Sequence, residues 1–261
     1  MNYSKDINED LNFSVLLGVN ARLDRFDRDG VESSGQNAFG FIEHGNFTTT
    51  SSQNNFPTTP VDLQRRTVEN LYATYGVLNV DYKSWLYLNL QARNDWSSTV
   101  EEDNQTIFYP SASVSFIPTT AFSGLESNVL NYMKVRVGYG QSAGYPDPYQ
   151  TRNRLTTVSQ AFISPNTNLG NAGVLSTNAT DNRLGNPNLT AELHSELEFG
   201  IEAKFWNNRI GLDASYYTKT TTDLIQDADL DPSTGYDITN INAGEIENEG
   251  YEVGLTVTPL I

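Results

Sequence analysis

A regular alternation of apolar and polar residues is the dominant pattern along this chain. In residues 85–93, leucine or alanine occupies every second position from Leu86, and Asn89, Gln91 and Arg93 lie between them. The same period of two recurs in residues 11–23, 133–139, 193–205, 210–216 and 251–257, and more weakly in 69–82 and 107–118. Because side chains of a β-strand point alternately to opposite sides, each segment predicts a strand with one apolar and one polar face. The chain is therefore expected to be all-β, with about eight strands of ~9–15 residues, longer than the usual strand.

The links between these strands alternate in length. Short or moderate turns are expected at 82–84, 119–131 and 206–209, whereas long polar links cover 26–65, 94–106, 141–190 and 222–248. Up-and-down outer-membrane barrels have short turns at one end and long extracellular loops at the other. The pattern thus predicts an antiparallel up-and-down transmembrane β-barrel, with the apolar face against lipid and the polar face toward a hydrated lumen. A soluble extracellular β-sandwich or a repeat adhesin has similar alternation and is the alternative.

Aromatic residues gather near the expected strand ends. In a membrane barrel such residues form rows at the two membrane–water interfaces. The candidates for these rows are Tyr82, Trp85, Phe108, Tyr109, Tyr139, Trp206, Tyr216 and Tyr217.

Composition narrows the chemistry more than the fold. The 261 residues include 32 acidic and 16 basic side chains, a net charge of −16 that argues against a nucleic-acid surface. The absence of Cys excludes disulfides and thiolate chemistry, and the two histidines, His44 and His194, are too few for a multi-histidine metal centre. The mean hydropathy of −0.46 suggests a soluble protein. A barrel wall, however, needs an apolar residue only at every second position, so the average does not argue against one.

Several segments carry a resemblance to a known family. They are residues 91–99, 108–116, 134–141, 148–151, 185–192 (Gly-Asn-Pro-Asn-Leu-Thr-Ala-Glu), 216–223 and 242–252. In this order and spacing, over most of residues 10–258, the chain resembles the barrel of the SusC/RagA class of TonB-dependent outer-membrane transporters.

The resemblance implies a larger barrel of about 22 strands, closed by an N-terminal plug, in the outer membrane of a Gram-negative bacterium. It also implies import of glycans or peptides, energy from a TonB complex acting through the plug, and a SusD-class surface lipoprotein as partner. Residues 1–261 are then expected to be one internal barrel segment in contact with the lipid bilayer. The segment 1–30 has no secretory signal pattern, and we expect the plug and remaining strands to lie outside this chain. Neither enzymatic activity nor a cofactor is implied.

Two other functions fit the residues alone. One is a soluble extracellular carbohydrate-binding β-domain. The other is a small autonomous eight-stranded barrel with adhesive loops, since eight strands suffice to enclose an interior filled by side chains.

Candidate functional residues fall into two groups. Tyr145, Tyr149 and Phe162, in the longest loop, could stack on a sugar or a peptide, or could pack that loop against its neighbours. Polar-face residues that could line a translocation path are Arg93, Lys134, Arg136, Glu196 and Asp213.

Catalytic and metal motifs are weak. Asp227, Asp229 and Asp231 have the spacing of a calcium loop, but Pro232 and Ile238 replace its required Gly and Glu, which leaves only a looser acidic calcium site open. The glycines of residues 138–144 precede no amphipathic helix and do not predict a dinucleotide site. Glu192, His194, Glu196 and Glu198 form a ladder along one strand face rather than a convergent catalytic site.

Overall fold

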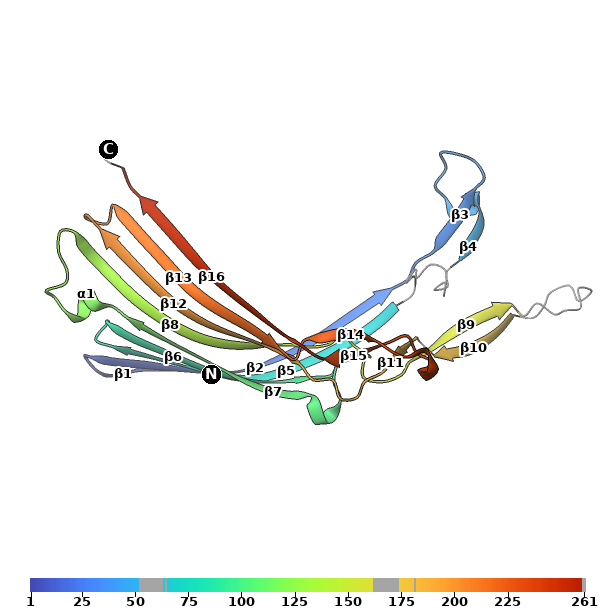
Figure 1. Cartoon of the computed structure of the whole chain (residues 1–261), viewed down its shortest axis with the longest axis horizontal. Helices are drawn as coiled ribbons and strands as arrows, with labels where there is room; N and C mark the ends of the chain where they lie inside the picture. The colour runs from blue at the N-terminus through green and yellow to red at the C-terminus, as the bar shows by residue number, and fades with distance from the viewer. Residues whose placement is uncertain (52–62, 64, 162–173, 181, 260–261) are drawn as a thin grey trace, which may run out of the picture. The chain divides into compact units, whose positions relative to one another are not determined.

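A computed structural model describes residues 1–51, 63, 65–161, 174–180 and 182–259 (Figure 1). The chain divides into two compact units, residues 1–20 with 72–261 and residues 21–71, which are described separately. A nine-stranded sheet has the order β1-β2-β5-β6-β7-β8-β12-β13-β16, and the β1–β2 pair and all neighbours from β6 to β16 run antiparallel. Its strands are β1 (Asn2–Asn8), β2 (Leu11–Arg28), β5 (Arg65–Tyr82), β6 (Leu86–Ser97), β7 (Thr106–Phe116), β8 (Leu130–Gly144), β12 (Glu192–Phe205), β13 (Ile210–Thr222) and β16 (Glu245–Val257).

The sheet order confirms the up-and-down prediction. All eight expected strands are present, and each lies beside the next wall strand in the chain. The ninth, β1, was not predicted, because Lys5, Asp6 and other polar residues interrupt any apolar alternation in Asn2–Asn8. Within the described residues β1 and β16 end the sheet order and do not pair with each other, so the strands do not close into a small barrel.

The long links contain short strands that the sequence pattern did not predict. In residues 21–71, β3 (Glu32–Gln36) pairs with β4 (Phe47–Ser51), joined through η1 (His44–Asn46). In the larger unit β9 (Leu155–Ala161) pairs with β10 (Val174–Thr180), and β15 (Ile238–Asn242) lies between β11 (Arg183–Leu184) and β14 (Ile225–Asp229). The remaining elements are η2 (Glu102–Asn104), η3 (Pro232–Thr234) and α1 (Pro118–Ala121). Among the residues described, no helix has the length and apolar character needed to cross a membrane.

Register between strands produces two faces of opposite character. Residues joined directly across β6, β7, β8, β12, β13 and β16 form rows, and adjacent rows point to opposite sides. One row, on what we term the outer face, is Leu88, Val114, Val137, Phe199, Tyr216 and Tyr251. The next row, on the inner face, is Asn89, Ser113, Gly138, Glu198, Tyr217 and Gly250.

Aromatic rings gather on the outer face. At the short-turn end, ring centroids are 5.3 Å apart between Tyr82 and Trp85, 5.5 Å between Trp85 and Phe116, and 6.3 Å between Phe116 and Phe122. Midway along β13 and β16, the rings of Tyr216 and Tyr251 lie 4.8 Å apart. The row at the short-turn end is typical of a membrane–water interface.

Two of the expected interfacial aromatics were assigned wrongly. Tyr109 and Tyr217 lie opposite Arg93 and Glu198, on the inner face. Each follows another aromatic residue, and consecutive strand residues point to opposite sides, so only Phe108 and Tyr216 of these pairs face outward.

The two faces predict opposite responses to one introduced charge. Ala112→Arg, on the outer face of β7 midway between Phe108 and Phe116, is expected to lower the free energy of unfolding by about 2–4 kcal/mol, because an arginine is costly at the centre of a bilayer. Ser113→Arg, one residue later on the inner face, is the matched control and is expected to change it little. Urea unfolding in lipid vesicles measures both. Equal losses for the two variants would contradict the assignment of faces.

Candidate functional site: inner wall and loop platform

A charged network lies flat on the inner face and joins three strands. The Arg136 Nε on β8 donates to Glu198 Oε1 on β12 at 3.2 Å, and its Nη2 donates to Asp213 Oδ1 on β13 at 3.0 Å. The guanidinium crosses the sheet above Gly200, where an added Cβ would lie 2.4 Å from Arg136 Nε. Glycine at this position therefore allows the long side chain to follow the wall instead of entering the lumen.

The other predicted path residues share the inner face but not this network. Arg93 Nε donates to Asp95 Oδ1 at 2.6 Å, and the buried Asp95 also accepts a hydrogen bond from the Tyr109 hydroxyl at 2.8 Å. Lys134 lies opposite Glu202 in the β8–β12 register. Glu196 lies opposite Lys219, with Oε2 and Nζ 3.9 Å apart. The structure thus places Arg136 and Asp213 together, and Arg93, Lys134 and Glu196 at separate points of the same face.

The three predicted loop aromatics have different environments. Tyr145, directly after β8, has a buried hydroxyl that finds no hydrogen-bond partner among the described residues, and burial raises its pKa. Its ring therefore packs the loop against the wall. Tyr149 is 42% exposed and has a left-handed backbone with φ of 69°. Phe162 lies outside the described residues. Their role in ligand binding stays a prediction.

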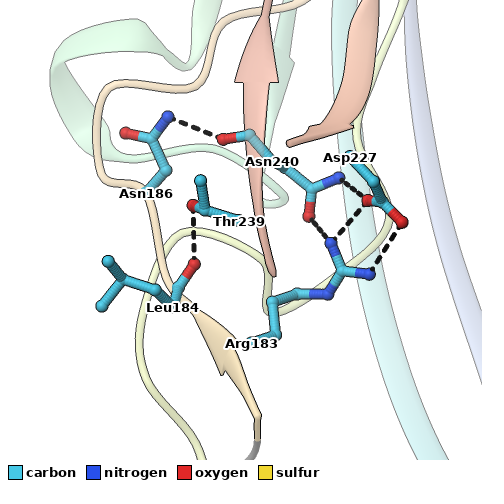
Figure 2. A network of polar contacts seen from close by, with 6 residues as sticks. All are labelled: Arg183, Leu184, Asn186, Asp227, Thr239 and Asn240. Carbon is cyan, nitrogen blue, oxygen red and sulfur yellow. Dashed lines mark hydrogen bonds and ion pairs between the residues drawn. The ribbon is translucent and has the colours of Figure 1, made fainter. Parts of the chain in front are cut away.

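A polar cluster ties the two longest loops of the larger unit together (Figure 2). Arg183 of β11 donates from Nη1 to Asp227 Oδ1 at 2.7 Å and also hydrogen-bonds to Asn240 Oδ1. Asn240, 5% exposed, donates to Asp227 Oδ1 at 2.9 Å, and its backbone oxygen accepts from Asn186 Nδ2 at 2.8 Å. Thr239 Oγ1 adds a hydrogen bond to the Leu184 carbonyl at 2.9 Å. We call β11, β14, β15 and residues 185–191 the loop platform.

The aspartates with calcium-loop spacing have other partners in this platform. Hydrogen bonds from Arg183 lower the pKa of Asp227, and Asp231 accepts from the Ser233 backbone N–H at 2.8 Å at the start of η3. In the part of the chain that the structure describes, no three His, Asp or Glu side chains are grouped closely enough to hold a metal ion.

The platform is joined to the wall at the first residue of β12 and to the η2 loop. Leu189 is fully buried, and its carbonyl accepts from Asn104 Nδ2 at 3.2 Å. Asn242 accepts from the Thr190 N–H at 2.8 Å and donates back to the Thr190 carbonyl at 3.0 Å. Glu192, the first residue of β12, accepts from the Ile225 N–H at 2.8 Å. Residues 185–192, noted in the sequence for family resemblance, are therefore the segment that joins loops to wall.

Beyond the platform, one more ion pair joins two loops. Glu101 carboxylate oxygens accept from Arg152 Nε at 2.8 Å and from Nη2 at 2.5 Å. Hydrogen bonds from Arg152 and Thr151 lower the pKa of Glu101 from its ordinary 4.5 to about 2. This pair was not predicted, because 51 residues separate its members and no local pattern marks either one.

The antiparallel wall with an apolar outer face, aromatic rows and long loops at one end defines an outer-membrane β-barrel. Residues 2–258 match the family model "TonB dependent receptor-like, beta-barrel", and the chain belongs to this family. It lies in the outer membrane, and the predicted membership of the TonB-dependent receptors is confirmed. The family decides in favour of the membrane barrel over a soluble β-domain.

Curated relatives agree with the family. TonB-dependent receptor P26 of Formosa agariphila is 30% identical over 257 residues, covering 98% of this chain and 24% of the relative. TonB-dependent receptor P3 of the same organism is 29% identical over 187 residues, covering 71% of this chain and 18% of the relative. The chain therefore spans about a quarter or less of the relatives' length.

Solved structures share the fold. The RagAB peptide transporter superposes with a TM-score of 0.76 at 21% identity, covering 99% of this chain and 27% of that one. A ferric enterobactin receptor mutant from Pseudomonas aeruginosa superposes with a TM-score of 0.56 at 14% identity, covering 97% and 32%.

The platform depends on Asn240. Asn240→Leu is expected to destabilise the platform locally by about 1–3 kcal/mol, because the partly buried guanidinium of Arg183 and the carboxylate of Asp227 each lose a hydrogen bond to the Asn240 side chain. Hydrogen–deuterium exchange of residues 182–192 and 225–242 measures the loss. Asp229→Ala, on an exposed position of β14, is the control and is expected to leave exchange unchanged. Unaltered exchange in the Asn240 variant would show that the network does not hold the platform.

The Glu101–Arg152 pair predicts a pH dependence of loop docking. Since the folded-state pKa of Glu101 is lowered, the stabilisation is fully present above pH 4.5 and is lost as the pH falls toward 2. Hydrogen–deuterium exchange of residues 145–154, corrected for the pH dependence of the intrinsic exchange rate, is expected to become faster as the pH falls from 4.5 toward 2. In Glu101→Gln the same acceleration is expected to be absent; if it persists, another group is responsible.

Proposed function

We propose that this chain forms wall and extracellular loops of a TonB-dependent transporter that imports glycans or peptides. The supporting observation is the pair of adjacent rows across six strands, one aliphatic or aromatic and the other polar or small. A sheet with these faces separates lipid from a hydrated lumen, and its inner face is the surface that a solute meets. Residues 1–261 act as one barrel segment, and the function is binding and translocation, not catalysis.

The proposed partners follow from the family. A TonB complex supplies energy through an N-terminal plug domain, and a SusD-class surface lipoprotein covers the loops. Similarity to a structure named a peptide transporter supports peptides as one solute class, while the relatives' names give no solute. Arg93, Lys134, Arg136, Glu196 and Asp213 are the proposed path residues. Tyr145, Tyr149 and Phe162 are the proposed loop contacts.

Uptake in the bacterium that encodes this chain tests the proposal. Deletion of the gene that contains it is expected to abolish accumulation of labelled oligopeptides or of labelled oligosaccharides, and a tonB deletion is expected to abolish the same uptake. A complemented strain and a small porin-permeable sugar serve as controls. Unchanged uptake of both solute classes in the deletion strain would overturn the proposal.

A further inference from the structure

A polar groove of about 640 Å³ lies along the inner face, toward the long-loop end of the wall. Its floor is formed by Gly138 and Gly140 of β8 beside Ser111 and Ser113 of β7. An added Cβ at Gly138 would lie 3.8 Å from Ser113 Cβ, and one at Gly140 would lie 3.6 Å from Ser111 Oγ, which are ordinary contact distances. The space above these two glycines is therefore open.

Two other inner-face glycines, Gly200 and Gly250, are covered by neighbouring side chains. The Tyr217 hydroxyl oxygen would lie 2.6 Å from a Cβ at Gly250, just as Arg136 occupies the space above Gly200. Glycine in those places makes room for a neighbouring side chain of the wall. At Gly138 and Gly140 no side chain of the wall takes the room, so the groove is available to a solute.

One side of the groove ends in a hydrogen-bond acceptor. Gln91 Nε2 donates to Asn89 Oδ1 at 2.8 Å, and Asn89 Nδ2 donates to Asn79 Oδ1 at 2.5 Å. The ladder continues from Asn79 Nδ2 to Ser14 Oγ at 3.2 Å. Asn89 and Gln91 both line the groove, and the Gln91 amide oxygen is an acceptor that this ladder does not use.

The opposite side carries a carboxylate that the wall neutralises poorly. The Glu196 side chain is 45% exposed, and the Lys219 Nζ lies 3.9 Å away, at the limit of an ion pair. Pairs this exposed contribute little to stability, so Glu196 loses little by exchanging Lys219 for a cation of a solute. Its neighbour Glu198, by contrast, is held by Arg136.

The shape and lining favour an extended cationic chain over a sugar. The groove crosses the wall from Asn89 and Gln91 of β6 to Lys219 and Thr221 of β13, and neighbouring strands lie ~4.8 Å apart, so its length suits an extended chain. Sugars are commonly held by stacking on aromatic rings. Tyr139 is the aromatic residue that borders the groove, but its position in the register places it on the outer face, in the row of Ala112 and Leu197.

We propose that the groove is a subsite for an ammonium group of an extended, peptide-like solute, with Glu196 as its acceptor and Gln91 as a further hydrogen-bond acceptor. Gly138 and Gly140 leave the room in which the solute chain lies. This inference rests on the proposed import function and names the solute class that the inner wall binds.

Direct binding tests the subsite. The probes are labelled tetralysine and its fully N-acetylated form, titrated by fluorescence anisotropy against the transporter containing this chain, purified from outer membranes in detergent. Glu196→Gln is expected to weaken tetralysine binding roughly fivefold, the effect of an exposed ion pair, and added salt is expected to reduce the difference. Acetylated tetralysine is expected to bind wild type and variant equally weakly. Gly140→Val, which fills the groove, is expected to abolish tetralysine binding.

Glu202→Gln is the matched control. Glu202 lies on the same face of β12, outside the groove, and its carboxylate is 3.4 Å from Lys204 Nζ. Its replacement is expected to leave the affinity unchanged. Equal affinity of wild type and Glu196→Gln for tetralysine, or equal loss in both glutamate variants, would overturn the subsite. Binding is measured apart from uptake, so the two proposals can fail separately. If the affinity for tetralysine does not depend on Glu196 while uptake is intact, only this inference is rejected. If tetralysine binding depends on Glu196 but the protein supports no uptake, only the import function is rejected.

Discussion

The need to pair every backbone N–H and C=O group inside hydrocarbon is the constraint on which this structure depends. Lipid supplies no hydrogen-bond partners, so a polypeptide that crosses it as strands must pair each strand with its neighbours. The wall from β6 to β16 satisfies this by antiparallel pairing between every two neighbouring strands. In paired strands the side chains can point only to one side of the sheet or the other. Because one side meets lipid and the other meets water, apolar and polar residues alternate along each strand.

Pairing also explains how long side chains are accommodated on the inner face. Direct partners across strands lie about 4.5–5.5 Å apart, which is close enough for one side chain to lie over its neighbour's Cα when that neighbour is glycine. Arg136 over Gly200 and Tyr217 over Gly250 follow this arrangement. The charge of Arg136 is thereby paired along the plane of the sheet. Gly138 and Gly140 differ from Gly200 and Gly250 in that no neighbouring side chain lies over them.

Local alternation was sufficient to predict eight wall strands, their order and the two faces. It failed for β1, which pairs with β2 although its polar residues leave no apolar face. It also failed for Tyr109 and Tyr217, because each follows another aromatic residue and only one residue of such a pair can face outward. Partners such as Arg183 and Asp227 are 44 residues apart in loops without periodicity, so no local signal joins them. The alternation along β12 predicted that Glu196 faces the lumen. The groove beside it could not be predicted, because it depends on which small residues of β7 and β8 pair with each other.

The loop platform is attached to the wall at the end of a strand that borders the groove. Glu192, the first residue of β12, accepts a hydrogen bond from the Ile225 N–H, and within the platform Asn242 pairs with both the N–H and the carbonyl of Thr190. His194 and Glu196 follow on the same face of that strand and border the groove. If the platform moves, either these hydrogen bonds break or the first residues of β12 move with it. Because β12 is paired on both sides along its length, breaking the local bonds costs less than moving the strand, so the loops are free to rearrange over a groove whose geometry stays fixed.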